Sequence, residues 1–281
     1  MNTRSNQTVG EQTAEILARG TYRSPAGREV DLRARLEAMR RATRLFTPAA
    51  VATLREREPR RLDHPARITL RNEPVLEAMD RVPTPDAGPG VLTLNFASAT
   101  KPGGGFLRKA VAQEESIARA TGLYASLLRA PAYYERNRVC GSALYTDHVI
   151  LSGEVPVIRT GDHTLLDTPG VCHVLTAPAP NAGRLLRHEA EHAWQLGPVF
   201  RDRLRGVLAV AADAGYRALI LGAWGCGVFR NPPRDVAGYF ADELLPGGRF
   251  SRSFEHVHFA VMDRPGGETE AAFRERLRLP G

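Results

Sequence analysis

The sequence lacks several features that define particular classes of protein. No run approaches the roughly 18 consecutive apolar residues that a membrane span needs, and the first residues, MNTRSNQTVGEQT, lack the apolar stretch of a secretory signal. The three cysteines, Cys140, Cys172 and Cys226, form an odd set without a C-x-x-C spacing. They indicate neither a disulfide framework nor a thiolate metal site. We therefore expect a cytoplasmic protein with free thiols and no membrane partner.

Lysine is also scarce, since Lys101 and Lys109 are the only lysines among the 38 basic residues. Such heavy use of arginine often reflects coding bias, but the formal net charge of +7 also favours acidic partners, because a positive field concentrates polyanions. Composition alone leaves both interpretations open. Both lysines nevertheless flank one glycine-rich stretch. With 281 residues and 43% apolar content, the chain is long enough to bury a sizeable core.

The pattern of apolar residues changes about a quarter of the way along the chain. The first part reads as polar and helical, with Leu32, Leu36 and Met39 at helical spacing. In the second part, short β-type runs alternate with helical stretches, as in an α/β domain whose parallel or mixed sheet lies between helices. We therefore predict a helical N-terminal extension over 1–64 and an α/β domain over 65–281.

Ligands of such sheets bind beyond the carboxyl ends of the strands. Three predicted strands end in sequences suited to a ligand: 95–105 (NFASATKPGGG), 176–183 (TAPAPNAG) and 222–233 (GAWGCGVFRNPP). The second of these is equally well explained as a simple connection. We expect the functional site where these loops meet.

The first loop combines three glycines, at 103–105, with Gln113, Glu114 and Glu115 at the start of a predicted helix. Each part is common by itself, because acidic residues in a first helical turn are stabilised by the helix dipole and glycines are ordinary loop residues. Together they place two carboxylates on a rigid helix end, beside backbone that can approach a ligand closely. This combination indicates a site.

The GGG-x7-QEE pattern, with the preceding Asn-Phe-Ala, resembles the signature of poly(ADP-ribose) glycohydrolases. The similarity covers roughly 65–265 as a macrodomain-like three-layer core with a mixed sheet flanked by helices, and 1–64 is similar to the helical N-terminal part of bacterial members. The domain over 65–281 is thereby predicted to be catalytic. Arg108 and Lys109 stand where bacterial members often have small residues. The resemblance implies a glycosidase that hydrolyses ribose–ribose O-glycosidic bonds and releases ADP-ribose.

The third loop has glycines between a predicted strand end and a predicted helix start. Such glycines expose successive backbone N–H groups, which form a cradle for an anion such as a diphosphate. The loop is no nucleotide-hydrolase P-loop, since no Gly-Lys-Ser/Thr follows. A glycine-rich turn without a ligand is the simpler alternative. The segment 222–229 resembles the diphosphate loop of macrodomain hydrolases, and the resemblance implies that Phe229 presses on the ribose next to the scissile bond.

The same resemblance implies roles for individual residues. Glu115 would protonate the departing ribose 2′-oxygen and then activate water, while Glu114 and Asn95 would hold ribose hydroxyls. Neighbouring residues on a helix diverge, so we do not expect the two glutamates to flank a bond from opposite sides, as the carboxylates of most glycosidases do. The substrate's own diphosphate would supply the negative charge that the transition state needs. The implied substrate-binding residues are Asn95, Phe96, Ala97, Gly103, Gly104, Gly105, Gln113, Gly225, Cys226, Gly227, Val228 and Phe229.

This mechanism needs no metal and no cofactor. The implied partners are poly(ADP-ribose) and poly(ADP-ribosyl)ated proteins, with ADP-ribose as product and no obligatory nucleic acid, in keeping with a role in the DNA damage response. Two alternatives keep the fold: a module that only binds ADP-ribose, and a hydrolase that removes single ADP-ribose units from proteins. A binding module has no need of a general acid, so the paired glutamates favour an enzyme.

A competing motif lies at 188–192 (HEAEH), which fits H-E-x-x-H, the helix signature of zinc proteases. On a helix, its two histidines would share one face. A catalytic zinc needs a third protein ligand, for which Asp213 is conceivable, but Gln195 stands where the extended motif has glycine. The simpler interpretation is a solvated helical face with Trp194 and Leu196 turned inward.

Overall fold

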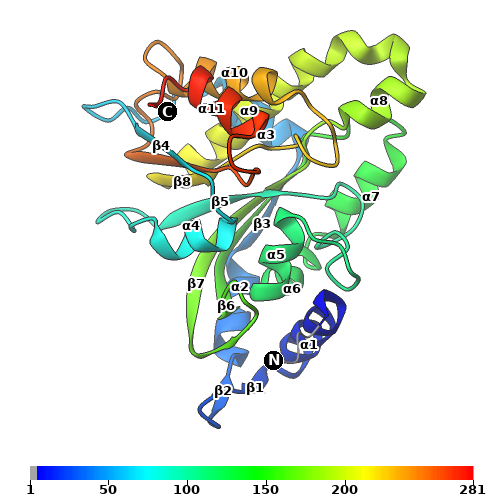
Figure 1. The fold of residues 1–281 in the computed structure, drawn as a ribbon, viewed down its shortest axis with the longest axis vertical. Coiled ribbons are helices and arrows are strands. Elements are labelled where there is room, and N and C mark those ends of the chain that lie inside the picture. The colour runs from blue at the N-terminus through cyan, green and yellow to red at the C-terminus, as the bar shows by residue number, and fades with distance from the viewer. Residues whose placement is uncertain (1–4, 281) are drawn as a thin grey trace.

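A seven-stranded mixed sheet forms the centre of the computed structural model, which describes residues 5–280 (Figure 1). Its strands are β3 (Thr43–Phe46), β4 (Arg67–Arg71), β5 (Val91–Phe96), β6 (Val149–Arg159), β7 (Leu165–Ala177), β8 (Ala218–Leu221) and β9 (His256–Ala260). Their order across the sheet is β3-β6-β7-β5-β8-β9-β4. Strands β7, β5, β8, β9 and β4 are parallel, whereas β6 is antiparallel to β3 and β7. The predicted mixed α/β fold is confirmed.

Helices cover both faces of the sheet and complete three layers (Figure 1). On one face lie α3 (Pro48–Glu56), α9 (Leu196–Asp213), α10 (Pro233–Leu244) and α11 (Glu268–Arg276), which contribute to one hydrophobic cluster. On the other lie α1 (Asn6–Arg19), α2 (Arg33–Ala42), α4 (Val75–Arg81), α5 (Gln113–Ala120), α6 (Leu123–Leu127) and α7 (Pro131–Val139), which contribute to a second. Two short elements, α8 (Ala182–His188) and the 3-10 helix η1 (Ala190–Gln195), connect β7 to α9.

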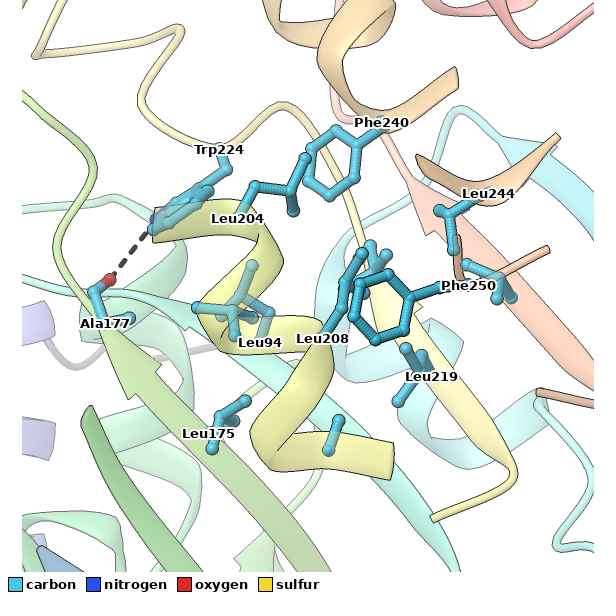
Figure 2. Close-up of a cluster of buried hydrophobic side chains, with 14 of the residues drawn as sticks. Leu94, Leu175, Ala177, Leu204, Leu208, Leu219, Trp224, Phe240, Leu244 and Phe250 are labelled. Atoms are coloured by element: carbon cyan, nitrogen blue, oxygen red, sulfur yellow. Dashed lines mark hydrogen bonds between the residues drawn. The ribbon is translucent and has the colours of Figure 1, made fainter. Parts of the chain in front are cut away.

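Figure 2 shows part of the first cluster, where Leu204 and Leu208 of α9 lie near Leu94 of β5 and Leu219 of β8. A fully buried leucine contributes about 1.5–3 kcal/mol through the hydrophobic effect. Because β8 is buried along its whole length and β5 along most of it, β8 reads as a continuous apolar run and β5 as a mostly apolar one, which is why the sequence indicated them. This packing fixes the ends of the strands from which the site loops depart.

The part of the chain before β4 contributes strands as well as helices. β1 (Thr21–Arg23) and β2 (Glu29–Asp31) form a small antiparallel hairpin, and β3 forms one edge of the central sheet. Helices α1 and α2 match the predicted helical stretches, and α3 also lies within the part that was predicted to be helical. Strand β3 was not predicted, because its sequence, TRLF, continues the helical spacing of α2. The division into 1–64 and 65–281 stays a prediction.

Candidate active site

Three loops meet at the carboxyl edge of the sheet. Strands β7, β5 and β8 are parallel neighbours, so the segments that follow them leave the sheet on the same side. The loops are also in contact. A Cβ placed on Gly222 would lie 3.0 Å from the ring of Phe96, and one placed on Gly225 would lie 2.5 Å from the Cβ of Ala179. The structure thus brings together the three loops that the sequence singled out.

The glycine loop closes around the carboxyl groups of α5. The Gly105 N–H donates to Glu115 Oε1 at 2.8 Å. Gly103 and Gly104 have φ angles of 67° and 60°, in the left-handed region that glycine adopts without strain. A Cβ on Gly104 would overlap Glu115 Oε1 and lie 2.8 Å from Glu114 Oε2. Position 104 therefore requires glycine, and both carboxyl groups lie against the same stretch of backbone.

Glu114 is 3% exposed and fully enclosed by protein. Its Oε2 accepts the Ser98 N–H at 2.7 Å, and its Oε1 accepts the Asn95 amide at 3.4 Å. The pKa of Glu114 is raised to about 8, mainly by burial. The nearby charge of Glu115 contributes to the rise, while the N–H donors from Ser98, Asn95 and Gly103 oppose it. Glu114 is therefore mostly protonated at neutral pH, and can offer a hydroxyl as a hydrogen-bond donor.

Two amide side chains connect the end of β5 to this helix start. Asn95 is completely buried and also donates to the Thr176 hydroxyl at 3.2 Å, but its Oδ1 has no hydrogen-bond partner within residues 5–280. Gln113 accepts the Phe96 N–H at 2.9 Å and donates to the Leu94 carbonyl at 2.7 Å. Gln113 thus fastens α5 to β5, and its predicted contact with substrate stays a prediction.

Side-chain hydrogen bonds fix the loop between β8 and α10 to the neighbouring strand end. Asn231 donates to the carbonyls of Pro180 and Gly225 at 2.8 and 2.9 Å, so it joins this loop to the segment that follows β7. Figure 2 shows the Trp224 indole directed at the Ala177 carbonyl, to which it donates at 3.2 Å. Sequence analysis missed Asn231, although it stands directly after the glycine-rich segment.

Residues 227–229 of the same loop have free backbone N–H donors. The N–H groups of Gly227, Val228 and Phe229 have no acceptor in the part of the chain that the structure describes, and Gly227 and Val228 are exposed. This arrangement suits an anion. Burial raises the pKa of the Cys226 thiol to about 12, so this thiol stays protonated and is a poor nucleophile.

A second aromatic ring, that of Tyr145, lies near Phe229, the residue predicted to contact the ribose. The rings of Tyr145 and Phe229 lie 6.0 Å apart, and Tyr145 has a φ of 59°. The buried Arg203 holds this region by donating to Asp147 at 2.8 Å and to the carbonyls of Tyr145 at 3.2 Å and Pro178 at 3.1 Å. No sequence signal marked Tyr145 or Arg203, because their partners are distant in the chain.

The predicted helical arrangement of the HEAEH segment is wrong. Helix α8 ends at His188, and Glu189 has a φ of −144°, outside the helical region. The Glu189 carboxylate instead accepts the Ser142 hydroxyl at 2.6 Å and the Ala143 N–H at 2.8 Å. Trp194, predicted to turn inward, is 74% exposed. Within residues 5–280, no group of three or more His, Cys, Asp or Glu side chains is placed to hold a metal ion.

A cavity of about 790 Å³ lies beside this segment. Its lining includes Glu189, His192, Asp202 and Arg203, and it reaches Tyr145. It contains none of the residues predicted for the site. The carboxyl groups around it disfavour a phosphate ligand, so we place the site at the glycine loops instead.

The fold and the loops define a class of protein: a macrodomain-like α/β enzyme, with buried acidic side chains beside an anion-binding loop at one edge of its sheet. A family profile described as the microbial-type PARG catalytic domain matches residues 10–160, more than half of the chain. The chain belongs to this microbial-type poly(ADP-ribose) glycohydrolase family and is a glycoside hydrolase that acts on poly(ADP-ribose).

Solved structures of the family agree with this assignment. The chain is 44% identical to the poly(ADP-ribose) glycohydrolase of Thermomonospora curvata, with a TM-score of 0.90 over 96% of this chain and 98% of that chain. The complex of that enzyme with the inhibitor ADP-HPD has the same identity and coverage and a TM-score of 0.88. The Deinococcus radiodurans enzyme in complex with ADP-ribose is 46% identical, with a TM-score of 0.81 over 88% of this chain and 98% of that one. No curated protein matches the chain significantly.

Proposed function

We propose that this chain cleaves poly(ADP-ribose) by acid/base catalysis with one carboxyl group, that of Glu115. The observation that carries the proposal is the hydrogen bond of 2.8 Å from the Gly105 N–H to Glu115 Oε1, which fixes that carboxyl group in the glycine loop. Glu115 protonates the leaving ribose 2′-oxygen, and the resulting carboxylate then takes a proton from the water that attacks the anomeric carbon. The general acid is regenerated in the second step.

Glu114 has a different role in this scheme. Its carboxyl group lies against Gly104 together with that of Glu115, so the two are not positioned on opposite sides of a bond. With a pKa of about 8, Glu114 stays mostly protonated near neutral pH. A neutral carboxyl group donates a hydrogen bond to a ribose hydroxyl without placing a second negative charge beside the carboxylate that Glu115 becomes after the first step. The unpartnered Oδ1 of Asn95 accepts from a hydroxyl in the same way.

The transition state resembles an oxocarbenium ion and requires negative charge nearby. In this scheme, the free N–H groups of 227–229 hold the diphosphate of the terminal ADP-ribose unit, and its negative charge stabilises the developing positive charge. The solved complexes of relatives with ADP-ribose and with the inhibitor ADP-HPD support binding of ADP-ribose here. Chemistry at the sugar thus needs no second enzymic carboxylate.

Poly(ADP-ribosyl)ated proteins are the proposed physiological substrates, and ADP-ribose is the product. Within residues 5–280, no helix is long and apolar enough to cross a membrane. Placement in the cytoplasm and a role in the DNA damage response stay predictions from the sequence and the family resemblance.

Incubation with purified poly(ADP-ribose) tests the proposed function directly. Chromatography of the products should show free ADP-ribose accumulating with time. Protein that binds ADP-ribose in a calorimeter and leaves the polymer intact would instead be a binding module. Release of ADP-ribose only from proteins that carry single ADP-ribose units would show that the chain is a mono-ADP-ribosyl hydrolase.

A further inference from the structure

An exposed segment with both cationic and apolar side chains follows the glycine loop. This segment, the 107–111 patch, consists of Leu107, Arg108, Lys109, Ala110 and Val111. Leu107 is 37% exposed and Val111 is 71% exposed, so both apolar side chains are available for contact. Neither Arg108 nor Lys109 has an ion-pair partner within residues 5–280. The whole stretch 97–112 contains no acidic residue, so the patch is a local source of positive charge.

The patch is held in place at both ends. The Arg108 N–H donates to the Gly105 carbonyl at 2.8 Å. The buried guanidinium of Arg119 donates to the Ala110 carbonyl, at 3.0 Å from Nη1 and also from Nη2. Between these anchors, the buried Phe106 ring lies 4.7 Å from that of Tyr124. The side chains of the patch therefore project from a fixed loop.

The position of this loop relates the patch to the reaction. Gly105, which donates to Glu115, stands two residues before the patch. In the proposed mechanism, the terminal ADP-ribose unit lies on the 222–229 loop, which follows β8, while Glu115 protonates the oxygen that leaves. That oxygen belongs to the next unit of the polymer. This next unit, the leaving unit, carries an adenine and a diphosphate on the ribose that Glu115 protonates.

We propose that the 107–111 patch binds the leaving ADP-ribose unit of the polymer. Arg108 and Lys109 pair with its diphosphate, and Leu107 and Val111 contact the adenine. Two further exposed cations lie close to the patch. Lys101 precedes the three glycines in the chain, and Arg138 donates to the Thr100 carbonyl at 2.9 Å, just before Lys101. The patch is a second binding site for an adenine nucleotide diphosphate, separate from the 222–229 loop. This inference rests on the proposed function.

The test compares two double variants of the full chain that lose the same charge. R108S/K109S removes the cations of the patch. R60S/R61S is the matched control, because Arg60 and Arg61 are adjacent, exposed and without an ion-pair partner in the described chain. They precede β4 and so lie toward the amino ends of the parallel strands, whereas the patch follows the carboxyl end of β5. KM and kcat are measured with poly(ADP-ribose) of defined length at two salt concentrations, and Kd is measured with ADP-ribose alone.

We expect R108S/K109S to raise KM for polymer at least about threefold, as the loss of two partly screened ionic contacts implies. Its KM should also depend less on salt, because fewer phosphates are neutralised on binding. The Kd of this variant for ADP-ribose should equal that of the parent, since free ADP-ribose binds where the terminal unit of the polymer binds, at the 222–229 loop. Val111→Ser should raise KM for polymer without changing the salt dependence.

Three results would overturn the proposal. The first is an unchanged KM for polymer in R108S/K109S. The second is an equal rise of KM in the control, because this would show general attraction of a polyanion. The third is a matching loss of affinity for ADP-ribose, because this would assign the cations to the terminal unit. A parent protein that does not hydrolyse polymer would defeat the proposed function itself, before the variants are compared.

Discussion

Gly10 in the middle of α1 lies directly against the backbone of Phe106 in the glycine loop. A Cβ on Gly10 would overlap the Phe106 carbonyl oxygen and lie 2.9 Å from its carbonyl carbon. Helix α1 is also joined to the end of α5 by the hydrogen bond of 2.7 Å from the Thr13 hydroxyl to the Arg119 carbonyl. The first helix of the chain therefore supports both ends of the segment that carries Glu115.

This contact predicts that Gly10→Ala impairs catalysis. Alanine favours a helix over glycine by about 1 kcal/mol, so the substitution should stabilise an isolated α1. In the protein, the added methyl group has to displace the loop at Phe106, and with it the Gly105 N–H that orients Glu115. Because misplacement by about 1 Å can cost about a hundredfold in rate, we expect kcat to fall by about ten- to a hundredfold.

Gly161→Ala is the matched control for this substitution, because a Cβ at Gly161 meets nothing within 4 Å. Initial rates with poly(ADP-ribose) and melting temperatures are compared for parent and both variants. A fall in kcat with a folded protein supports the role of α1. If Gly10→Ala has the rate and the melting temperature of the parent, the contact with Phe106 does not position the loop.

Glu114 gives a prediction for the pH dependence of stability. Its pKa is about 8 in the folded protein, well above the ordinary value of 4.5, so the folded state keeps a proton that the unfolded state releases. Stability should therefore fall as the pH rises from about 4.5 to about 8, with a limiting slope of about 1.4 kcal/mol per pH unit. Glu114→Gln removes this proton and its contribution to the slope.

The measurement is the free energy of unfolding by urea between pH 5 and pH 9 for parent and variant. The difference between Glu114→Gln and the parent should change in favour of the variant as the pH rises, and become constant above about pH 8. The common contributions of all other groups cancel in this difference. A difference that does not vary with pH would show that Glu114 is ionised in the folded protein.

The sequence was sufficient to predict the central strands and the meeting of three loops at the carboxyl edge of the sheet. Strands β5 and β8 are mostly buried and mostly apolar, and the glycine-rich segments that follow them are recognisable from the local sequence alone. The edge strand β3 was missed because its residues continue the apolar spacing of α2, and only pairing with β6 makes them a strand.

Long-range hydrogen bonds explain the other differences. The HEAEH segment has helical spacing, but Glu189 leaves the helix and bonds Ser142 and Ala143, more than 40 residues away. Asn231 and Arg203 likewise bond carbonyls of the segment after β7. A periodic pattern contains no information on such partners.

Activity should not depend on a divalent metal ion. The proposed mechanism uses a carboxyl group and water, and the one metal-like motif does not form a continuous helix that would bring its two histidines to one face. Hydrolysis of polymer is measured before and after dialysis against EDTA, and again after zinc is added. Loss of activity with EDTA that zinc restores would contradict the assignment of Glu115.

Phe229→Ala should lower kcat more than it weakens the binding of ADP-ribose. The half-buried Phe229 ring stands beside Tyr145, where it can orient the reacting ribose, and orientation acts mainly on the barrier. We expect a fall of about tenfold or more in kcat and a much smaller rise in Kd. Trp194→Ala, which removes an exposed aromatic ring outside the site, is the control. A loss confined to Kd would refute an orienting role for Phe229.

Glu115→Gln is the variant that separates an enzyme from a binding module. In the parent, the Gly105 N–H donates to Glu115 Oε1 at 2.8 Å. The amide oxygen of glutamine can accept the same N–H, so the glycine loop should keep its shape. The side chain can no longer give a proton to the leaving oxygen. Binding of ADP-ribose should therefore survive, while turnover should fall by about a thousandfold or more, in the upper part of the range for general acid–base catalysis.

Glu114→Gln is the matched comparison, because it changes the adjacent residue in the same way. If Glu114 is protonated and only holds a hydroxyl, its amide replacement keeps a hydrogen-bond donor, and the loss of rate should be smaller than for Glu115→Gln. Polymer hydrolysis and calorimetric binding of ADP-ribose are measured for both variants at pH 7. Hydrolysis by Glu115→Gln at close to the parent rate would remove Glu115 from the mechanism. A larger loss in Glu114→Gln than in Glu115→Gln would instead reverse the two roles, because each substitution leaves the neighbouring carboxyl group in place.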